Sequence, residues 1–211
     1  MSNNLTGNGP MTADHWWWRE GWGSGTRFLT WHLTFQQSPV LHAHAAAYRE
    51  LLAGFPQLDL VPDHGLHLTM QGVGPVQDVT ATELTALTDA ARKRLSDLRP
   101  LAFRFDKPAF TPEAIRWEPA PAEPVVEIRN VLRGAIHEVW DQVPESAGGF
   151  TPYVTIAYGN RVAPASPIIA AIEDSSILPV TATVATADLI VLGRDRHEYE
   201  WEYAAKVLLG D

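Results

Sequence analysis

Apolar and polar positions alternate along several short stretches of the chain. The stretch 27–35 alternates strictly, which predicts a strand with one buried and one polar face. Its apolar face comprises Leu29, Trp31, Leu33 and Phe35, and its polar face comprises Thr30, His32 and Thr34. Further strands are predicted over 58–61, 66–73, 101–106, 114–118, 153–158, 179–184, 187–192 and 198–208.

Apolar residues recur at helical spacing between these strands. This spacing predicts helices over 39–54, from Thr80 to about Leu98, over 125–143 and over 164–174. Ser38 followed by Pro39 is typical of a helix start, because serine caps the first turn and proline fits its first position. Thr80 with Glu83 three residues later forms a capping-box pattern.

The order of these elements is strand, helix, two strands, helix and strand, followed by roughly the same series again. It predicts an α+β fold in which helices cover one side of antiparallel sheets. With the polar strand faces and the family resemblance described below, we expect a bilobal fold with two antiparallel sheets facing each other across a central cleft and helices on the outside. Residues 1–14 are polar and glycine-rich and are expected to form a disordered N-terminal segment. Residues 15–211 are then a single bilobal domain with its lobe boundary near the proline-rich stretch 119–124.

Composition narrows the possible functions. Apolar residues make up 45% of the 211 positions, which is enough for a real core, and the formal net charge is −9. Such a charge disfavours long nucleic acid as a partner but not a small phosphorylated ligand. The absence of cysteine rules out disulfides, thiol catalysis and cysteine metal ligands. Because we see neither a membrane-length apolar run nor a secretory signal, we expect a cytoplasmic protein.

Candidate chemistry lies on the polar faces of three predicted strands. His67 and Thr69 are two residues apart, as are Tyr153 and Thr155, so each pair projects from one face of its strand. His32 lies on the polar face of the first strand. Polar rows opposite apolar rows on three strands predict a polar cleft between the sheets.

Weaker candidates surround this cleft. Gln71 shares the face of His67 and is a possible substrate ligand, and His32 is either a second imidazole of the cleft or a structural hydrogen-bonding group. Arg194, in a predicted hairpin loop, either reaches a substrate or belongs to a solvated turn. The tryptophans over 16–22 form either a lid packed on the domain or a platform that stacks on a planar ligand. The histidine spacings match no metal site.

Two motifs carry a family resemblance. His67-Leu68-Thr69-Met70 resembles the H-x-T-x motif of the two-histidine phosphoesterase superfamily, which includes 2′-5′ RNA ligase-like and cyclic nucleotide phosphodiesterase proteins. The segment from Thr151 to Ala157 resembles the second motif of that superfamily, and the resemblance extends from about residue 26 to residue 209. The His-Trp-Trp-Trp start and the strand with Trp31 resemble an actinobacterial branch.

The chain departs from the family pattern at one position, because Tyr153 stands where the family has its second histidine. In the family, one imidazole accepts a proton from the nucleophile, the other donates to the leaving oxygen, and the two threonines bind non-bridging oxygens. A tyrosine, with an ordinary pKa of about 10, is a donor rather than a base at neutral pH. The resemblance therefore implies His67 as base and Tyr153 as acid or oxyanion donor, aided by Thr69 and Thr155.

The resemblance implies a metal-independent phosphoesterase without cofactors, acting on a cyclic or 2′-5′ phosphodiester of a small nucleotide or related metabolite. Two alternatives remain open. The protein either binds a phosphorylated ligand without turning it over, or uses the same cleft for a different reaction of specialised metabolism. The sequence does not fix the oligomeric state.

Overall fold

A computed structural model describes residues 9–210 of the chain. In chain order the main elements are β1 (Phe28–Thr34), α1 (Pro39–Leu52), β2 (Leu58–Leu60), β3 (His67–Pro75), α2 (Ala81–Leu95), β4 (Leu101–Phe105), β5 (Ala109–Thr111), β6 (Ala114–Trp117), α3 (Glu123–Val139), β7 (Val154–Gly159), α4 (Ser166–Asp174), β8 (Val180–Val184), β9 (Thr186–Gly193) and β10 (Glu200–Leu208). Two short 3₁₀ helices, Asp63–Gly65 and Val76–Asp78, flank β3.

The strands form two four-stranded antiparallel sheets. The first has the order β10-β9-β1-β3 and the second the order β2-β7-β6-β5. Strands β4 and β8 pair separately as a small two-stranded sheet. The predicted α+β class with antiparallel sheets is confirmed, whereas the third sheet and strand β5 were not expected, since prolines at positions 108 and 112 flank β5.

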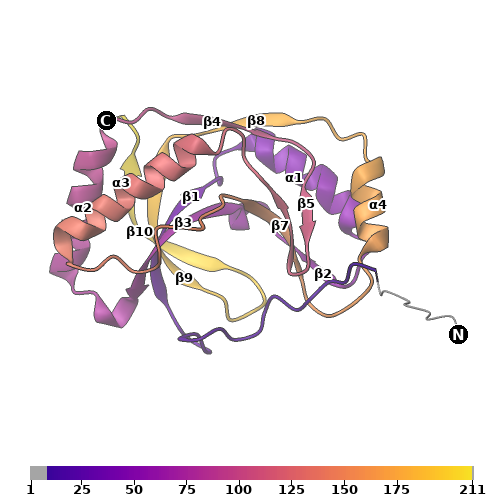
Figure 1. The fold of residues 1–211 in the computed structure, drawn as a ribbon, viewed down its shortest axis with the longest axis horizontal. Helices are drawn as coiled ribbons and strands as arrows, with labels where there is room; N and C mark the ends of the chain where they lie inside the picture. The colour runs from indigo at the N-terminus through magenta and orange to yellow at the C-terminus, as the bar shows by residue number, and fades with distance from the viewer. Residues whose placement is uncertain (1–8, 211) are drawn as a thin grey trace, which may run out of the picture.

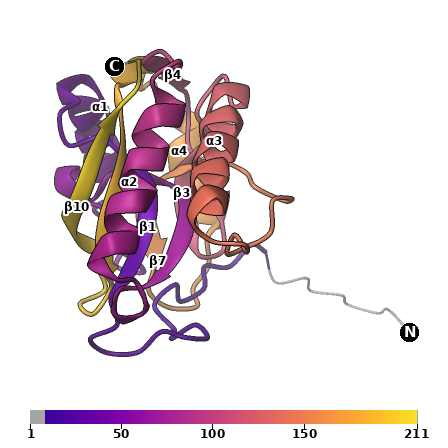
Figure 2. The same cartoon turned by 90° about the vertical axis from the view of Figure 1, so that its left-hand side faces the viewer.

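Helices cover the sheets at opposite ends of the molecule (Figure 1), α2 and α3 at one end and α1 and α4 at the other. Figure 2 shows α2 and α3 side by side in front of β1 and β3. The apolar faces of both sheets thus enter a core that includes Trp31, Leu68, Ile156 and Leu189, each at most 1% exposed. This packing leaves the opposite, polar faces available to form a site.

Local sequence signals set the helix starts. Thr80 and Glu83 form the predicted capping box, in which the Glu83 amide donates to Thr80 Oγ1 at 3.2 Å and the Thr80 amide donates to Glu83 Oε2 at 2.8 Å. Ser38 precedes Pro39 at the start of α1, but its side chain makes no capping hydrogen bond. Among residues 9–210, no helix is both long and apolar enough to cross a membrane.

The N-terminal residues correct one expectation. Residues 1–8 of the expected disordered segment lie outside the described residues, but residues 9–14 are ordered. The Thr12 amide donates to the Ala163 carbonyl at 2.8 Å, and Met11 forms an isolated β-bridge with Pro164. Backbone pairing of this kind offsets the loss of chain entropy. Residues 10–25, here called the N-terminal strap, run along the lower edge of the molecule (Figure 1).

The expected lobe boundary near 119–124 stays a prediction. In the structure this stretch connects β6 to α3, and Ala120 pairs with Arg104 in an isolated β-bridge.

Candidate active site

A cavity of about 290 Å³ lies where β3, β7 and the β9–β10 loop meet the N-terminal strap. It is lined by His15, Arg19, Trp22, Phe28, Thr30, His67, Thr69, Gly72, Glu145, Tyr153, Tyr158, Leu192, Arg194 and Tyr199. Four of the seven residues predicted from sequence are in this wall, namely His67, Thr69, Tyr153 and Arg194. The cavity therefore combines both strand motifs with residues that no motif identified.

His67 is held in one tautomer. Its Nδ1 lies 2.8 Å from the carbonyl oxygen of Gly65, which only accepts hydrogen bonds, so Nδ1 carries the proton. Nε2 is then an unprotonated acceptor on a ring that lines the cavity. Burial lowers the pKa of His67 below 6.5, against the opposing effect of the Gly65 carbonyl, so the ring is neutral at pH 7. A neutral imidazole with a free nitrogen is what a general base requires.

His32 is not in the cavity wall. Its side chain is fully buried because the ring of His67 lies over it, with ring centroids 4.7 Å apart and planes 4° from parallel. His32 Nε2 lies 3.3 Å from Thr69 Oγ1, while Nδ1 has no partner among the described residues. His32 thus does not face the cleft as expected, and its role as a substrate ligand stays a prediction. Its contacts are those of a group that supports His67 and Thr69.

Gln71 is not in the cavity wall either, although its side chain lies 3.3 Å from the wall residue Glu145. The register between β1 and β3 shifts by one residue, because Trp31 pairs with Gln71 while His32 pairs with Thr69. This bulge at Met70 ends the alternation that placed Gln71 beside His67. The Gln71 amide instead accepts from Arg133 at 2.7 Å and donates to the Pro144 carbonyl at 2.6 Å. Gln71 as a substrate ligand therefore stays a prediction, which its position outside the cavity wall does not support.

The second motif carries a matching irregularity. The register between β6 and β7 shifts because Ile115 pairs with Ala157 while Arg116 pairs with Thr155, which leaves Ile156 as the extra residue. As a consequence, Tyr158 joins the cavity wall, although alternation alone placed it on the apolar face.

Tyr153 and Thr155 occupy different environments. Tyr153 is 40% exposed and lines the cavity, with the Arg116 guanidinium 4.5 Å above its ring centroid. Thr155 is 4% exposed and is not part of the wall, and its Oγ1 has no partner within hydrogen-bonding geometry among the described residues. Tyr153 is thus positioned to touch a ligand, whereas Thr155 lies behind the surface.

Arg194 is a buried part of the site and not a solvated turn. It is 4% exposed, and its Nη2 donates to the carbonyl of His15 at 2.8 Å. The guanidinium also lies 5.5 Å from the ring of Trp16 and 5.6 Å from the ring of Tyr199, within cation–π range. Its aromatic neighbours hold this charge in the cavity wall without neutralising it.

The N-terminal strap supplies residues that sequence reasoning missed. His15 is 7% exposed and stacks on Tyr158, with ring centroids 4.2 Å apart. Burial, with the nearby charge of Arg19, lowers the pKa of His15 to about 4. Of the strap tryptophans, Trp16 is 7% exposed, Trp22 lines the cavity, and Trp17 and Trp18 are 52% and 47% exposed.

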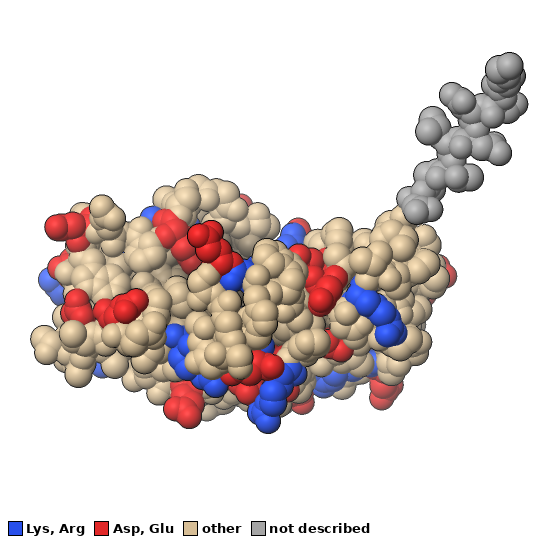
Figure 3. All heavy atoms as spheres, turned by 90° about the horizontal axis from the view of Figure 1, so that it is seen from below, with Lys and Arg blue, Asp and Glu red and all other residues tan. Residues whose placement is uncertain are grey.

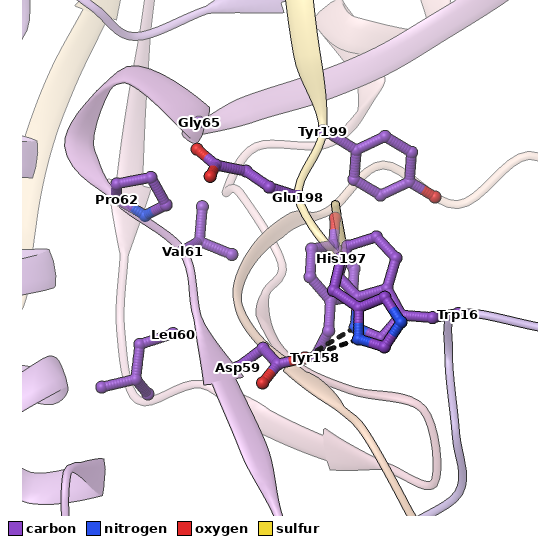
Figure 4. A pocket seen from close by; sticks show the side chains of 10 residues that line it. All are labelled: Trp16, Asp59, Leu60, Val61, Pro62, Gly65, Tyr158, His197, Glu198 and Tyr199. Carbon is purple, nitrogen blue, oxygen red and sulfur yellow. Dashed lines mark hydrogen bonds and ion pairs between the residues drawn. The ribbon is translucent and has the colours of Figure 1, made fainter. Parts of the chain in front are cut away.

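A smaller pocket of about 20 Å³ lies next to the cavity and shares Tyr158 and Tyr199 with it (Figure 4). It is large enough for a water molecule but not for a substrate. Trp16 Nε1 donates to Asp59 Oδ2 at 2.8 Å, and the Trp16 ring stacks on His197 with centroids 5.4 Å apart. In Figure 4 the Tyr199 hydroxyl points away from Val61 and Pro62. We interpret the contacts of Trp16 beside this pocket as those that anchor the N-terminal strap.

Within residues 9–210, no group of three or more His, Asp and Glu side chains is placed to hold a metal ion. His64 and His42 belong to separate ion pairs, His64 with Glu198 at 2.7 Å and His42 with Asp63 at 4.0 Å.

Known structures share this architecture. TT0787 of Thermus thermophilus is 18% identical, covers 87% of this chain and 98% of its own, and superposes with a TM-score of 0.64. E. coli LigT complexed with 3′-AMP is 16% identical, covers 88% and 99%, and gives 0.63. The MHV ns2 PDE domain is 12% identical, covers 79% and 99%, and gives 0.52. At these identities the likeness establishes the fold.

The sequence itself adds a family assignment. Among curated proteins, no sequence matches the chain. The family model of the 2′-5′ RNA ligase superfamily, however, matches residues 37–196. This segment contains both strand motifs, while His15 and Tyr199 lie outside it. Since the model covers most of the chain and the fold agrees with it, the chain belongs to the 2′-5′ RNA ligase superfamily.

Proposed function

We propose that this protein is a metal-independent phosphoesterase that acts on a cyclic or 2′-5′ phosphodiester of a small nucleotide or related metabolite. The observation that carries the proposal is the state of His67. Its Nδ1 proton is committed to the Gly65 carbonyl at 2.8 Å, so a neutral Nε2 is available in a cavity that also contains Thr69 and Tyr153. The cavity is thus lined by one candidate base, His67, and by two residues with hydroxyl donors, Thr69 and Tyr153.

The proposed reaction needs one proton acceptor and one proton donor. His67 Nε2 takes a proton from a water molecule as the water oxygen bonds to phosphorus. The phosphorus–oxygen ester bond then breaks. The leaving oxygen either takes a proton from the Tyr153 hydroxyl or accepts a hydrogen bond from it. Because Tyr153 is 40% exposed, solvent can return its proton after each turnover. Thr69 donates to a non-bridging oxygen.

The charges of the wall support an anionic substrate. Arg19 and Arg194 line the cavity together with one carboxylate, that of Glu145. A phosphodiester carries one negative charge and accepts hydrogen bonds from guanidinium groups. The guanidinium of Arg19 is paired with the Glu113 carboxylate at 2.8 Å, whereas that of Arg194 donates to the neutral carbonyl of His15. Arg194 is therefore the better candidate for direct phosphate contact.

Size and surface charge support a small substrate. A cavity of about 290 Å³ is at the lower end of the range for small-molecule sites. On the described part of the face in Figure 3, acidic and basic side chains are interspersed and form no basic stripe. With a net charge of −9, this pattern does not favour a long nucleic-acid backbone. E. coli LigT has been crystallised with 3′-AMP and with ATP, which agrees with a small nucleotide.

The test is product formation from a panel of 2′,3′-cyclic nucleotides and 2′-5′-linked dinucleotides in the presence of EDTA. We expect wild-type protein to turn over at least one of them and His67→Ala to lose that activity by about 10²-fold or more. His64→Ala is the matched control, because His64 lies on the surface and is expected to keep full activity.

Other outcomes distinguish the alternatives. Loss of activity in EDTA that returns with a divalent metal would contradict the metal-independent mechanism. If folded wild-type protein forms no product but a nucleoside monophosphate raises its melting temperature, the protein is a binding member of the family; a ligand at 100 times its Kd adds about 2.7 kcal/mol.

A further inference from the structure

Three residues outside the two motifs form a continuous hydrogen-bonded chain that ends in the cavity. Glu113 Oε2 lies 3.2 Å from His15 Nδ1, and His15 Nε2 lies 2.9 Å from the Tyr199 hydroxyl. Glu113 comes from the β5–β6 turn, His15 from the N-terminal strap and Tyr199 from the β9–β10 loop. The proposed mechanism uses none of them, although His15 and Tyr199 both line the cavity.

The direction of the protons along this chain follows from its first member. Glu113 also receives hydrogen bonds from Arg19 at 2.8 Å and from Trp17 at 3.1 Å. Although burial raises the pKa of Glu113, its hydrogen bonds and the Arg19 charge lower it overall, so it is a carboxylate and accepts only. His15 Nδ1 lies 3.2 Å from this carboxylate and 3.4 Å from Arg19 Nη2. We assign the shorter contact as the hydrogen bond, in which Nδ1 donates to Glu113, and Nε2 is then an acceptor. The Tyr199 hydroxyl then donates to Nε2.

This direction decides what the Tyr199 oxygen offers to a ligand. Its proton points at His15, so the remaining lone pair is an acceptor. Burial raises the pKa of Tyr199 above 10, so the phenol stays protonated at neutral pH. An oxygen of this kind attracts a hydrogen-bond donor and does not attract a phosphate oxygen, which has no hydrogen to donate.

Tyr199 is next to the proposed base. The rings of His67 and Tyr199 have centroids 5.6 Å apart and meet edge to face at 71°. The cavity wall thus has an acceptor on each of two neighbouring rings, His67 Nε2 and the Tyr199 oxygen. Water is the reactant that donates two hydrogen bonds, and fixing both of its protons directs its lone pair toward phosphorus.

We propose that Tyr199, held by His15 and Glu113, is a second acceptor for the attacking water beside His67. This inference rests on the proposed function. One water proton passes to His67 Nε2 as the oxygen–phosphorus bond forms, and the other stays on the oxygen, hydrogen-bonded to Tyr199. Tyr199 keeps its own proton throughout. Tyr199 is then a catalytic residue, and His15 and Glu113 are positioning residues.

The kinetic test compares Tyr199→Phe with Tyr203→Phe. Tyr203 is the matched control, because it belongs to β10 and its hydroxyl donates to Gln36 at 2.8 Å, outside the cavity. We expect Tyr199→Phe to lower kcat about 10- to 100-fold, the effect of losing one or two hydrogen bonds in the transition state. KM and the Kd of the product monophosphate should stay within about 2-fold of wild type.

Two substitutions of His15 test whether it positions the Tyr199 hydroxyl. Glutamine at position 15 keeps one donor and one acceptor, whereas leucine keeps neither. His15→Leu should therefore lose as much kcat as Tyr199→Phe, and His15→Gln should recover most of it. Unchanged kcat in Tyr199→Phe, or parallel loss of product affinity, would overturn the inference, since Tyr199 would then be inert or a substrate ligand.

A second measurement is independent of turnover. Nitrogen-15 NMR of histidine-labelled protein at pH 7 should show His15 as the neutral tautomer protonated at Nδ1, with the resonance assigned by its loss in His15→Gln. A His15 protonated at Nε2, or at both nitrogens, would overturn the inference whatever the activity. Failure of the proposed function appears instead as no turnover by wild type or full turnover by His67→Ala.

Discussion

The imidazole rings of His32 and His67 lie face to face, 4.7 Å between centroids and 4° from parallel. The two residues come from neighbouring strands, β1 and β3, and only His67 reaches the cavity. His32 Nε2 also contacts Thr69 Oγ1 at 3.3 Å. His32 thus supports both members of the first motif from beneath.

His32→Phe tests this support. Phenylalanine keeps a ring beneath His67 but removes the contact to Thr69, so kcat should fall about 2- to 10-fold, the worth of one hydrogen bond. The melting temperature should change little, because the buried Nδ1 of His32 has no partner to lose among the described residues. An unchanged kcat in a folded variant would show that Thr69 is oriented without His32.

Tyr153 is tested by two substitutions. Tyr153→Phe removes the proposed donor and should lower kcat by about 10²-fold, at the lower end of general acid catalysis. Tyr153→His restores the residue that the family has here, and should match or exceed wild type on 2′,3′-cyclic nucleotides. Full activity of Tyr153→Phe would remove Tyr153 from the mechanism. Loss of activity in both Tyr153→Phe and Tyr153→His would show that tyrosine is adapted to the native substrate.

The pH dependence of kcat/KM should report His67. Burial lowers the pKa of His67 below 6.5, and the base acts when neutral, so kcat/KM should rise with pH through a midpoint below 6.5 and then stay level through neutrality. A second histidine would add a falling limb near pH 7. A bell-shaped profile centred near pH 7 would contradict the assignment of His67 as base and Tyr153 as donor.

Stability should fall in mild acid because of His15. Its pKa is about 4 in the folded protein and near 6.5 when unfolded. Between these values only the unfolded chain binds the proton, so the contribution of His15 is complete above pH 6.5 and is lost as pH falls toward 4. The free energy of unfolding that is lost in this way amounts to about 3 kcal/mol. Urea unfolding from pH 7.5 to 4.5 should show a smaller loss for His15→Gln, and equal losses would contradict this account.

Gly159 sets the position of the N-terminal strap. A Cβ at this position would collide with the Ala13 carbonyl oxygen and approach the Pro112 carbonyl oxygen to 3.2 Å. Neither backbone group yields easily, so Gly159→Ala should displace the strap, remove His15 from the cavity and lower stability by about 1–3 kcal/mol. Kinetics and limited proteolysis would detect this. Gly54→Ala, which meets no atom within 4 Å, is the control, and equal behaviour of the two variants would refute the prediction.

Much of the fold was predictable because its signals are local. Alternation located β1 and β3, and the Thr80–Glu83 capping box located the start of α2. Strand β5 was missed because it is three residues long and flanked by proline, which reads as a loop. Which strands pair with which depends on contacts between distant residues, and periodicity contains no information about these.

The candidate site was predictable only in part. His67, Thr69 and Tyr153 line the cavity as their motifs imply. Tyr158 lines the cavity and Gln71 does not, the reverse of the positions that alternation predicts, because alternation assumes a regular strand and both central strands contain a bulge. A bulge depends on the partner strand, so the sequence of one strand does not reveal it.

The sequence by itself determined the residues of the two motifs, their secondary structure and the family to which they point, because each depends on residues close together in the chain. Only the tertiary structure decided that His15, Glu113 and Tyr199 meet beside His67. These three residues are far apart in the sequence and lie on a strap, a turn and a loop without a shared periodicity. Their hydrogen bonds exist because the strap docks on β7, where the His15 amide donates to the Gly159 carbonyl at 2.8 Å.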